Sequence, residues 1–190
     1  MLDLAEAMIP TPKLSRGARL LLRAPRAEDE REFISLVASS QRFLTDWVSP
    51  PADAERFAAY LRRSQETTFE ALLLVRREDQ ALLGAVNLSQ IFRGGFQNAY
   101  LDYWIGAPYA RQGYMREGLG LALDHAFKTL RLHRLEANIQ PANTASKKLV
   151  EGLGFRLEGF SPRYLKIRGR WRDHERWAIL KEDWRPTHPR

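Results

Sequence analysis

A short turn at residues 110–113 has the residue types of an anion-binding site. Gly113 lets the backbone approach a ligand closely, and the first amides of a helix that follows have no partner inside that helix. Unpaired amides at the positive end of a helix dipole bind phosphate, and Arg111 and Arg116 add positive charge. The pattern indicates a pyrophosphate cradle, and an ordinary turn between a strand and a helix is the alternative that it leaves open.

This turn joins two segments with different periodicities. Residues 100–105 are aromatic and β-branched and contain no breaker before Gly106, which predicts a strand. From Tyr114 onward, apolar residues recur at helical spacing, which predicts a helix that ends near Leu130. The two elements would therefore hold the turn between the end of a strand and the start of a helix.

The remainder of the chain also alternates between strand and helix patterns, without an internal repeat or a linker. Strands are predicted at residues 19–24, 71–77, 82–91, 99–105, 134–140, 155–160 and 171–180. Further helices are predicted at 28–39 and 53–65, and from Asn143, a good helix cap, to about Gly152. We expect one α/β domain of mixed sheet at 19–185, with an extension at 1–18 and a tail at 186–190.

Composition excludes several kinds of chemistry. The chain has no cysteine, so disulfides, thiolate metal sites and a cysteine nucleophile are excluded. Its four histidines show no metal-ligand spacing, and no metal is expected: His125, His133, His174 and His188. No apolar run reaches the length of a membrane span and no signal pattern opens the sequence, so we expect a cytoplasmic protein without a membrane partner.

The charge balance favours polyanionic partners. Thirty basic and 23 acidic residues give a formal net charge of +7, which attracts a phosphorylated cofactor or RNA. Part of the excess is concentrated at residues 163–172, where a solvated face is the alternative interpretation.

Several motifs resemble the GNAT-type N-acetyltransferase superfamily over residues 19–184. Residues 110–115 stand in place of its acyl-CoA signature, Gln/Arg-x-x-Gly-x-Gly/Ala, of which only Gly113 matches the strict pattern. Residues 138–146 and 153–159 are similar to motifs of the ribosomal-protein-alanine N-acetyltransferases, and residues 169–174 resemble the hairpin tail of that subgroup. The resemblance spans several independent segments.

The resemblance implies a GNAT-like acyl-CoA N-acyltransferase fold. Its central sheet is mostly antiparallel, with two splayed parallel strands at 99–105 and 134–140, and about four helices flank it. Acetyl-CoA, as cosubstrate, would lie between the splayed strands. The implied cofactor-binding residues are Tyr103, Trp104, Ile105, Arg111, Gln112, Gly113, Tyr114, Met115, Asn138 and Asn143.

The resemblance also implies catalytic residues. Ser146 would protonate the departing CoA thiolate, whereas the alternative is a first-turn serine that bonds its own helix. Because there is no cysteine, direct attack of an amine on acetyl-CoA is the expected mechanism. No general base is assigned; Tyr103, Glu117 and His174 are candidates that would act through a water molecule. An α-amino group, with a pKa near 8, needs such a base less than a lysine does.

The expected acceptor is the N-terminal alanine of a ribosomal protein, or another protein N-terminus. Phe43, Leu44 and Trp47 would wall its pocket, although core packing is an equal alternative. Arg168 and Arg170, in the basic hairpin, would recognise an acidic peptide or ribosomal RNA. A small-molecule amine acetyltransferase acting on a polyamine or aminoglycoside, and a non-catalytic ribosome- or RNA-binding protein, remain alternatives. Monomer and homodimer are both compatible with the sequence.

Overall fold

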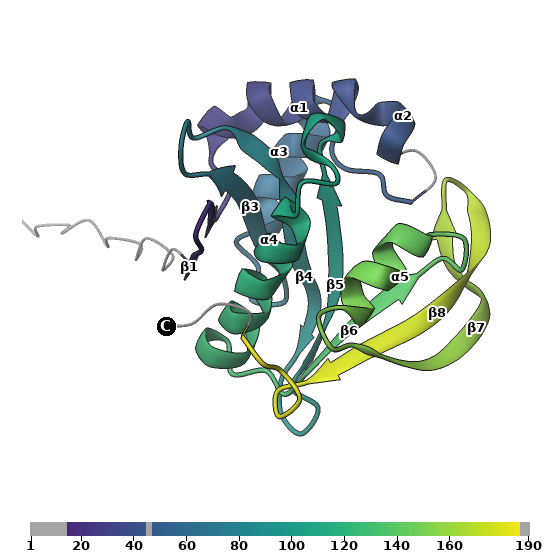
Figure 1. Cartoon of the computed structure of the whole chain (residues 1–190). Coiled ribbons are helices and arrows are strands. Elements are labelled where there is room, and N and C mark those ends of the chain that lie inside the picture. The colour runs from purple at the N-terminus through teal and green to yellow at the C-terminus, as the bar shows by residue number, and fades with distance from the viewer. Residues whose placement is uncertain (1–14, 45–46, 187–190) are drawn as a thin grey trace, which may run out of the picture.

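Eight strands form one twisted sheet in the computed structural model, which describes residues 15–44 and 47–186 (Figure 1). Their order across the sheet is β1-β2-β3-β4-β5-β6-β8-β7, and every neighbouring pair is antiparallel except β5 and β6. The strands are β1 (Ser15–Arg16), β2 (Leu20–Arg23), β3 (Glu70–Arg76), β4 (Leu82–Phe92), β5 (Asn98–Ile105), β6 (Arg134–Ile139), β7 (Arg156–Ile167) and β8 (Arg170–Leu180). The predicted mixed sheet, mostly antiparallel with one parallel pair, is confirmed.

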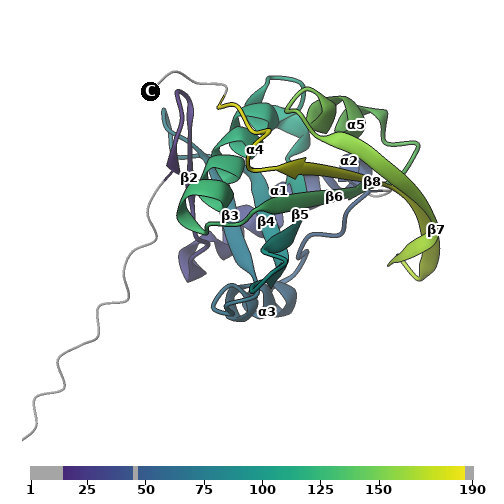
Figure 2. The same cartoon turned by 90° about the horizontal axis from the view of Figure 1, so that it is seen from below.

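Helices cover both faces of this sheet. They are α1 (Glu30–Ser39), α2 (Gln41–Leu44), α3 (Ala54–Arg63), α4 (Tyr114–Asp124) and α5 (Thr144–Glu151), and a π-helical segment, His125–Thr129, continues α4. Figure 2 shows α3 and α4 on opposite sides of the sheet. We call the side covered by α1 and α3 the α3 face, and the side covered by α4 and α5 the α4 face. No helix in the described part of the chain is long and apolar enough to cross a membrane.

Alternation along the strands gives each face its own core. On the α3 face, the ring of Phe33 lies 5.0 Å from that of Phe57 and 5.2 Å from that of Trp104, between ring centroids. On the α4 face, leucines of α4 such as Leu119 pack with Val86 of β4 and Leu101 of β5. Successive side chains of a strand point to opposite faces, so neighbouring residues of β5 belong to different cores. This alternation determines the face of the sheet on which each functional side chain lies.

Glu117 ties the start of α4 to β2. Its buried carboxylate accepts hydrogen bonds from the backbone amides of Arg19 and Leu20 (2.8 and 3.1 Å) and pairs with the Arg19 guanidinium at 2.9 Å. Burial opposes ionisation, but these bonds outweigh it and lower the pKa of Glu117. The carboxylate is therefore occupied by structure, which argues against the suggested role of Glu117 as a general base.

We expect Glu117→Gln to destabilise the fold in a pH-dependent way. At pH 7 the change removes the ion pair and leaves a buried amide without a partner, at a cost of roughly 1–3 kcal/mol. Because the folded-state pKa of Glu117 is lowered, its contribution is present above the unfolded-state pKa and is lost as pH falls through the folded-state pKa. Urea unfolding at pH 7 and pH 3 should show a difference in unfolding free energy between wild type and variant that is larger at pH 7 than at pH 3. A gap of the same size at both values would contradict this account.

The predicted elements occur with shifted ends. The strand predicted at 155–160 continues to Ile167, where its basic residues pair with β8 in a long hairpin. The helix predicted to reach Leu130 changes to π-helical geometry at His125. Within the predicted extension, residues 1–14 lie outside the described residues, whereas Ser15–Arg16 pairs with β2. Two of the residues expected to wall the acceptor pocket, Phe43 and Leu44, lie in the short helix α2, and residues 45–46 after it lie outside the described residues.

Candidate active site

The central feature of the site is a gap between β5 and β6. The two parallel strands pair only at Asn98–Arg134, Ala99–Leu135 and Tyr100–Glu136, after which they separate. From Leu101 to the end of β5, one edge pairs with β4, and β6 offers the other edge no ladder partner. Backbone amides and carbonyls along that edge are therefore available to an extended ligand.

A cavity of about 1280 Å³ occupies this gap and reaches both faces of the sheet. Its lining includes Tyr103, which packs with the core of the α4 face, and Trp104, which belongs to the core of the α3 face. It also includes Ser146 of α5 and Tyr60 of α3, which lie on opposite sides. Groups on the two faces can therefore contact one reacting centre from opposite directions.

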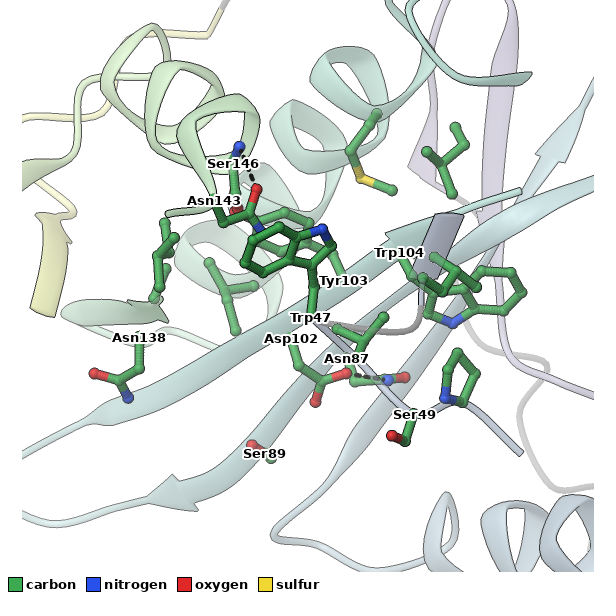
Figure 3. A pocket seen from close by; sticks show the side chains of 18 of the residues that line it. Trp47, Ser49, Asn87, Ser89, Asp102, Tyr103, Trp104, Asn138, Asn143 and Ser146 are labelled. Atoms are coloured by element: carbon green, nitrogen blue, oxygen red, sulfur yellow. Dashed lines mark hydrogen bonds between the residues drawn. The ribbon is translucent and has the colours of Figure 1, made fainter. Parts of the chain in front are cut away.

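On the α4 face, two hydroxyl groups form a pair. The Tyr103 hydroxyl and the Ser146 Oγ lie 2.5 Å apart, and the Asn143 side chain caps α5 by accepting a bond from the Ser146 amide at 3.1 Å (Figure 3). Burial raises the pKa of Tyr103 to about 12, against the opposing effect of the Ser146 bond. Tyr103 is thus a proton or hydrogen-bond donor near pH 7 and is excluded as the base. The Ser146 hydroxyl bonds another residue across the site, which disfavours the interpretation of Ser146 as a purely local helix serine.

Asn138 shows that the cavity fits a chain carrying amide groups. Its Oδ1 is buried and has no hydrogen-bond partner among the described residues, although the residue lines the cavity from β6. A buried acceptor of this kind is costly unless a ligand supplies a donor. Its neighbours Ala137 and Ile139 belong to the α4-face core, so the Asn138 side chain points to the α3 face. An N–H group of a ligand that lies within the gap, such as an amide of the pantetheine arm of acetyl-CoA, would satisfy it. The residues of the gap therefore fit this cosubstrate.

The predicted anion turn has the required backbone shape. Gly113 is the N-cap of α4 in the left-handed region (φ 81°, ψ −3°), and no side chain caps the amides that follow. Arg111 is also left-handed, with φ 62°. Arg111, Gly113, Tyr114 and Met115 line the cavity. Gln112 is absent from the lining, because its side chain donates to the Pro108 carbonyl and its own carbonyl accepts from Arg19.

Two predicted acceptor contacts lie in the cavity wall and two do not. Phe43 and Trp47 line the cavity, together with Leu44, which is also part of the α3-face core. Arg168 and Arg170 lie at the turn of the β7–β8 hairpin and are not among the lining residues. Their predicted contact with an acceptor would therefore have to occur outside the cavity. Other residues of the same hairpin do line it: Tyr164, Leu165, Ile167 and His174.

His174 is held as a neutral donor. Its ring is buried, and Nδ1 donates to the Arg172 carbonyl at 3.0 Å. Burial lowers the pKa of His174, with partial opposition from the bond to Arg172 and from nearby Asp173. This arrangement favours a structural role for His174 and argues against its suggested role as a general base.

A polar chain on the α3 face was not found by sequence reasoning. The Tyr60 hydroxyl donates to Asn87 Oδ1 at 2.7 Å. Asn87 Nδ2 in turn donates to Asp102 Oδ1 at 2.6 Å (Figure 3). All three residues line the cavity. Asp102 and Asn87 are direct cross-strand partners, which only the register of β4 and β5 reveals. A sequence signal did exist, since each is a polar residue between two apolar or aromatic neighbours within its strand.

No group of three or more histidine, aspartate or glutamate side chains that could hold a metal ion occurs within residues 15–44 and 47–186. A gap between splayed strands, an anion turn and a hydroxyl pair together define an acyl-CoA-dependent transferase site. The chain belongs to the GNAT acetyltransferase family, because the model of the acetyltransferase (GNAT) domain matches residues 19–156. This confirms the resemblance and the N-acetyltransferase class.

Known proteins similar to the chain differ in their acceptors. A probable N-acetyltransferase of Bacillus subtilis, YjcK, is 30% identical over 88% of this chain and 97% of its own. The ribosomal protein uS5-alanine N-acetyltransferase of Escherichia coli is 38% identical over 57% of this chain and 56% of its own. Spermidine N(1)-acetyltransferase of Vibrio cholerae is 26% identical over 87% of this chain and 95% of its own. The structure of Mycobacterium smegmatis RimJ in complex with CoA-disulfide superposes with a TM-score of 0.79 at 26% identity, covering 86% of this chain and 82% of that one.

Proposed function

We propose that this protein is a cytoplasmic enzyme that transfers the acetyl group of acetyl-CoA directly to a protein N-terminal amine, and that its acceptor is the N-terminal alanine of a ribosomal protein. The likeness to the Escherichia coli alanine N-acetyltransferase supports the acceptor class. The spermidine acetyltransferase among the relatives makes a polyamine the competing acceptor.

The charge of the cavity wall is the observation that supports the peptide over the polyamine. Among the described lining residues, Asp102 is the only carboxylate, and four arginines accompany it: Arg56, Arg63, Arg111 and Arg116. A polyamine carries several positive charges and needs several carboxylates. Arg111 and Arg116 belong to the anion turn, but Arg56 and Arg63 of α3 lie on the acceptor side of the cavity, where they would repel a polyamine. A peptide N-terminus brings one positive charge, which one carboxylate can match.

Different residues of the site would bind the cosubstrate, protonate the leaving group and enclose the acceptor. Acetyl-CoA supplies the acetyl group as an activated thioester. The amides after Gly113, with Arg111, would hold the pyrophosphate, while Asn138 and the free edge of β5 would hold the pantetheine arm. The hydroxyls of Tyr103 and Ser146 would donate to the sulfur as it leaves. Phe43 and Trp47 would exclude water around a small first side chain.

Thiol release from acetyl-CoA tests the proposal against a panel of acceptors. The panel contains peptides that begin with Ala, Ser or Met, an N-acetylated peptide with a free lysine, spermidine and an aminoglycoside. We expect selective turnover of the Ala peptide, followed by the Ser peptide. Turnover of spermidine or the aminoglycoside alone would overturn the acceptor assignment, and absence of both acetyl-CoA binding and turnover would overturn the enzymatic assignment.

The basic hairpin provides a separate prediction about protein acceptors. Because Arg168 and Arg170 are exposed at the hairpin turn, outside the cavity, replacing both with glutamate should raise KM for an acidic protein or peptide acceptor and spare acetyl-CoA affinity. An increase in KM of about 10-fold is expected if each charge contributes on the order of 0.5–1 kcal/mol.

A matched control makes the same change of charge elsewhere. Arg131 and Lys181 are also exposed but lie at the opposite end of β8, so Arg131→Glu with Lys181→Glu should leave KM unchanged. Equal losses of acceptor and acetyl-CoA binding in the hairpin variant would count against a role in acceptor recognition.

A further inference from the structure

Asp102 is a carboxylate exposed to the cavity in the middle of a strand. It lies between Leu101 and Tyr103, both of which contribute to the α4-face core, so its own side chain points to the α3 face. Asn87 stands directly opposite on β4 and likewise points to the α3 face, because its neighbours Val86 and Leu88 belong to the other core. Asp102 and the Tyr103 hydroxyl therefore approach the gap from opposite faces of the sheet.

The polar chain fixes one oxygen of this carboxylate, and no residue in the described part of the chain donates a hydrogen bond to the other. Asn87 donates to Oδ1 of Asp102 at 2.6 Å and is itself held by the Tyr60 hydroxyl at 2.7 Å. Tyr60 is buried in the aromatic cluster of the α3 face, with its ring 5.7 Å from that of Phe33 between centroids. The chain thus anchors a cavity carboxylate to rigid core, as a positioned binding or catalytic group requires.

The surroundings of Asp102 contain few groups that could neutralise it. From α3 the cavity-lining groups are Arg63, whose guanidinium stacks 4.0 Å from the Phe69 ring centroid, Arg56 and the neutral Tyr60. From β5 it is Tyr100, and from β7 it is Tyr164. Burial raises the pKa of Asp102, while the Asn87 bond and the charge of Arg63 oppose the rise. No ion pair joins Asp102 to Arg63 at salt-bridge distance among the described residues.

We propose that Asp102 receives the ammonium group of the acceptor on the α3 face and takes its proton as the acetyl group is transferred. The free oxygen of Asp102 accepts a hydrogen bond from the ammonium and removes one proton. The nitrogen lone pair then forms the new C–N bond to the acetyl carbon, and the C–S bond breaks. The CoA sulfur keeps that electron pair and takes a proton from the Tyr103–Ser146 pair, which is reprotonated from solvent. The nitrogen gives up its second proton to solvent as the amide forms, and Asp102 later releases its own, so the reaction releases one proton overall.

Tyr60 and Asn87 are positioning residues in this proposal, because they act only through Asp102. The inference rests on the proposed amine acetylation but not on which amine is used. Any primary amine that is positively charged near pH 7 presents the same ammonium to Asp102. Failure of the alanine assignment would appear with the wild-type enzyme, whereas failure of the Asp102 assignment would appear only in the variants.

The test is the pH dependence of kcat/KM for Asp102→Asn, which keeps the shape of the side chain and an oxygen for Asn87. The assay uses an alanyl hexapeptide, or spermidine if that is the amine the wild type acetylates. Without a base the variant can use only the neutral amine, so with the peptide its kcat/KM should fall about 100-fold below wild type at pH 6, where roughly 1% of an α-amine is neutral. The deficit should disappear as pH rises through the pKa of the amine, near 8 for the peptide. Tyr60→Phe should retain this behaviour with a loss of about 3- to 10-fold, as for one neutral hydrogen bond.

A binding measurement provides a readout that is independent of turnover. Calorimetry on the CoA-saturated protein at pH 6 compares the acceptor amine with its N-acetylated form. Wild type should bind the ammonium form more tightly, and Asp102→Asn should lose that preference while keeping its CoA affinity. Asp79→Asn is the matched control, because Asp79 is an exposed aspartate outside the cavity lining. The proposal is overturned if Asp102→Asn keeps wild-type kcat/KM at pH 6, if its deficit is the same at every pH, or if its preference for the ammonium form is unchanged.

Discussion

Replacing Tyr103 with phenylalanine is expected to lower kcat by about 10- to 100-fold, at the low end of the contribution of a positioned proton donor. The expected loss of kcat is modest because the leaving group is a thiol with a pKa near 8.5, which needs little help from a proton donor to depart. Affinity for acetyl-CoA should change little, since the change removes one oxygen and keeps the aromatic ring. Single-turnover rates and CoA affinity, measured on the same preparation, separate these two effects.

The pair of hydroxyls gives this prediction a further test. Because the Tyr103 and Ser146 hydroxyls bond each other across the site, removing both should cost little more than removing either. Ser64→Ala is the control, since it removes a hydroxyl at the end of α3 that bonds the Leu61 carbonyl. Additive losses in the double variant would show that the two hydroxyls act independently, and an unchanged kcat for Tyr103→Phe would contradict its assigned role.

Replacing Gly113 with alanine is expected to raise the Kd for CoA by about 10-fold. A Cβ at φ 81° is strained, and it would lie 3.3 Å from Nη2 of Arg19. Relief of roughly 1–2 kcal/mol of left-handed strain requires the turn to change shape, which moves the first amides of α4 away from the phosphates. Binding of CoA, measured by calorimetry, reports this directly.

Gly94→Ala is the matched control for the anion turn. Gly94 is also left-handed, with φ 68°, and nothing lies within 4 Å of a Cβ placed there. The control should lose similar stability yet keep its CoA affinity. Dephospho-CoA, which keeps the pyrophosphate, should show the same loss with Gly113→Ala, whereas pantetheine, which lacks it, should not. If pantetheine binding falls equally, the turn does not act on the phosphates.

The order of elements was predictable because each has a strong local pattern. The aromatic segment at 100–105 and the apolar helix after Tyr114 carry their periodicity within a dozen residues, and both occur as β5 and α4. The length of β7 was not predictable from local sequence, because its basic residues are typical of a solvated segment. Only their pairing with β8 makes them part of a strand. Local periodicity therefore predicted the strand and the helix that hold the site, β5 and α4.

The residue pairs proposed to act in the reaction are far apart in the sequence. Local sequence patterns therefore could not predict that they meet. Tyr103 and Ser146 are 43 positions apart, and Asn87 and Asp102 are 15 positions apart on neighbouring strands. The family resemblance pointed to Ser146 and to the anion turn. It did not point to Asp102, because that role depends on the cross-strand register and on which core each neighbouring residue joins.

In the proposed reaction, acetyl-CoA and a peptide N-terminus occupy the gap between β5 and β6 together, from opposite faces. A bisubstrate analogue tests it most directly, with the CoA sulfur joined through an acetyl bridge to the α-nitrogen of an alanyl hexapeptide. Calorimetry should show it binding at least about 100-fold more tightly than CoA, because one molecule fills both sites at a single entropic cost. The same analogue built on spermidine should gain little. Equal affinity of the alanyl analogue and CoA, or a larger gain for the spermidine analogue, would contradict the account.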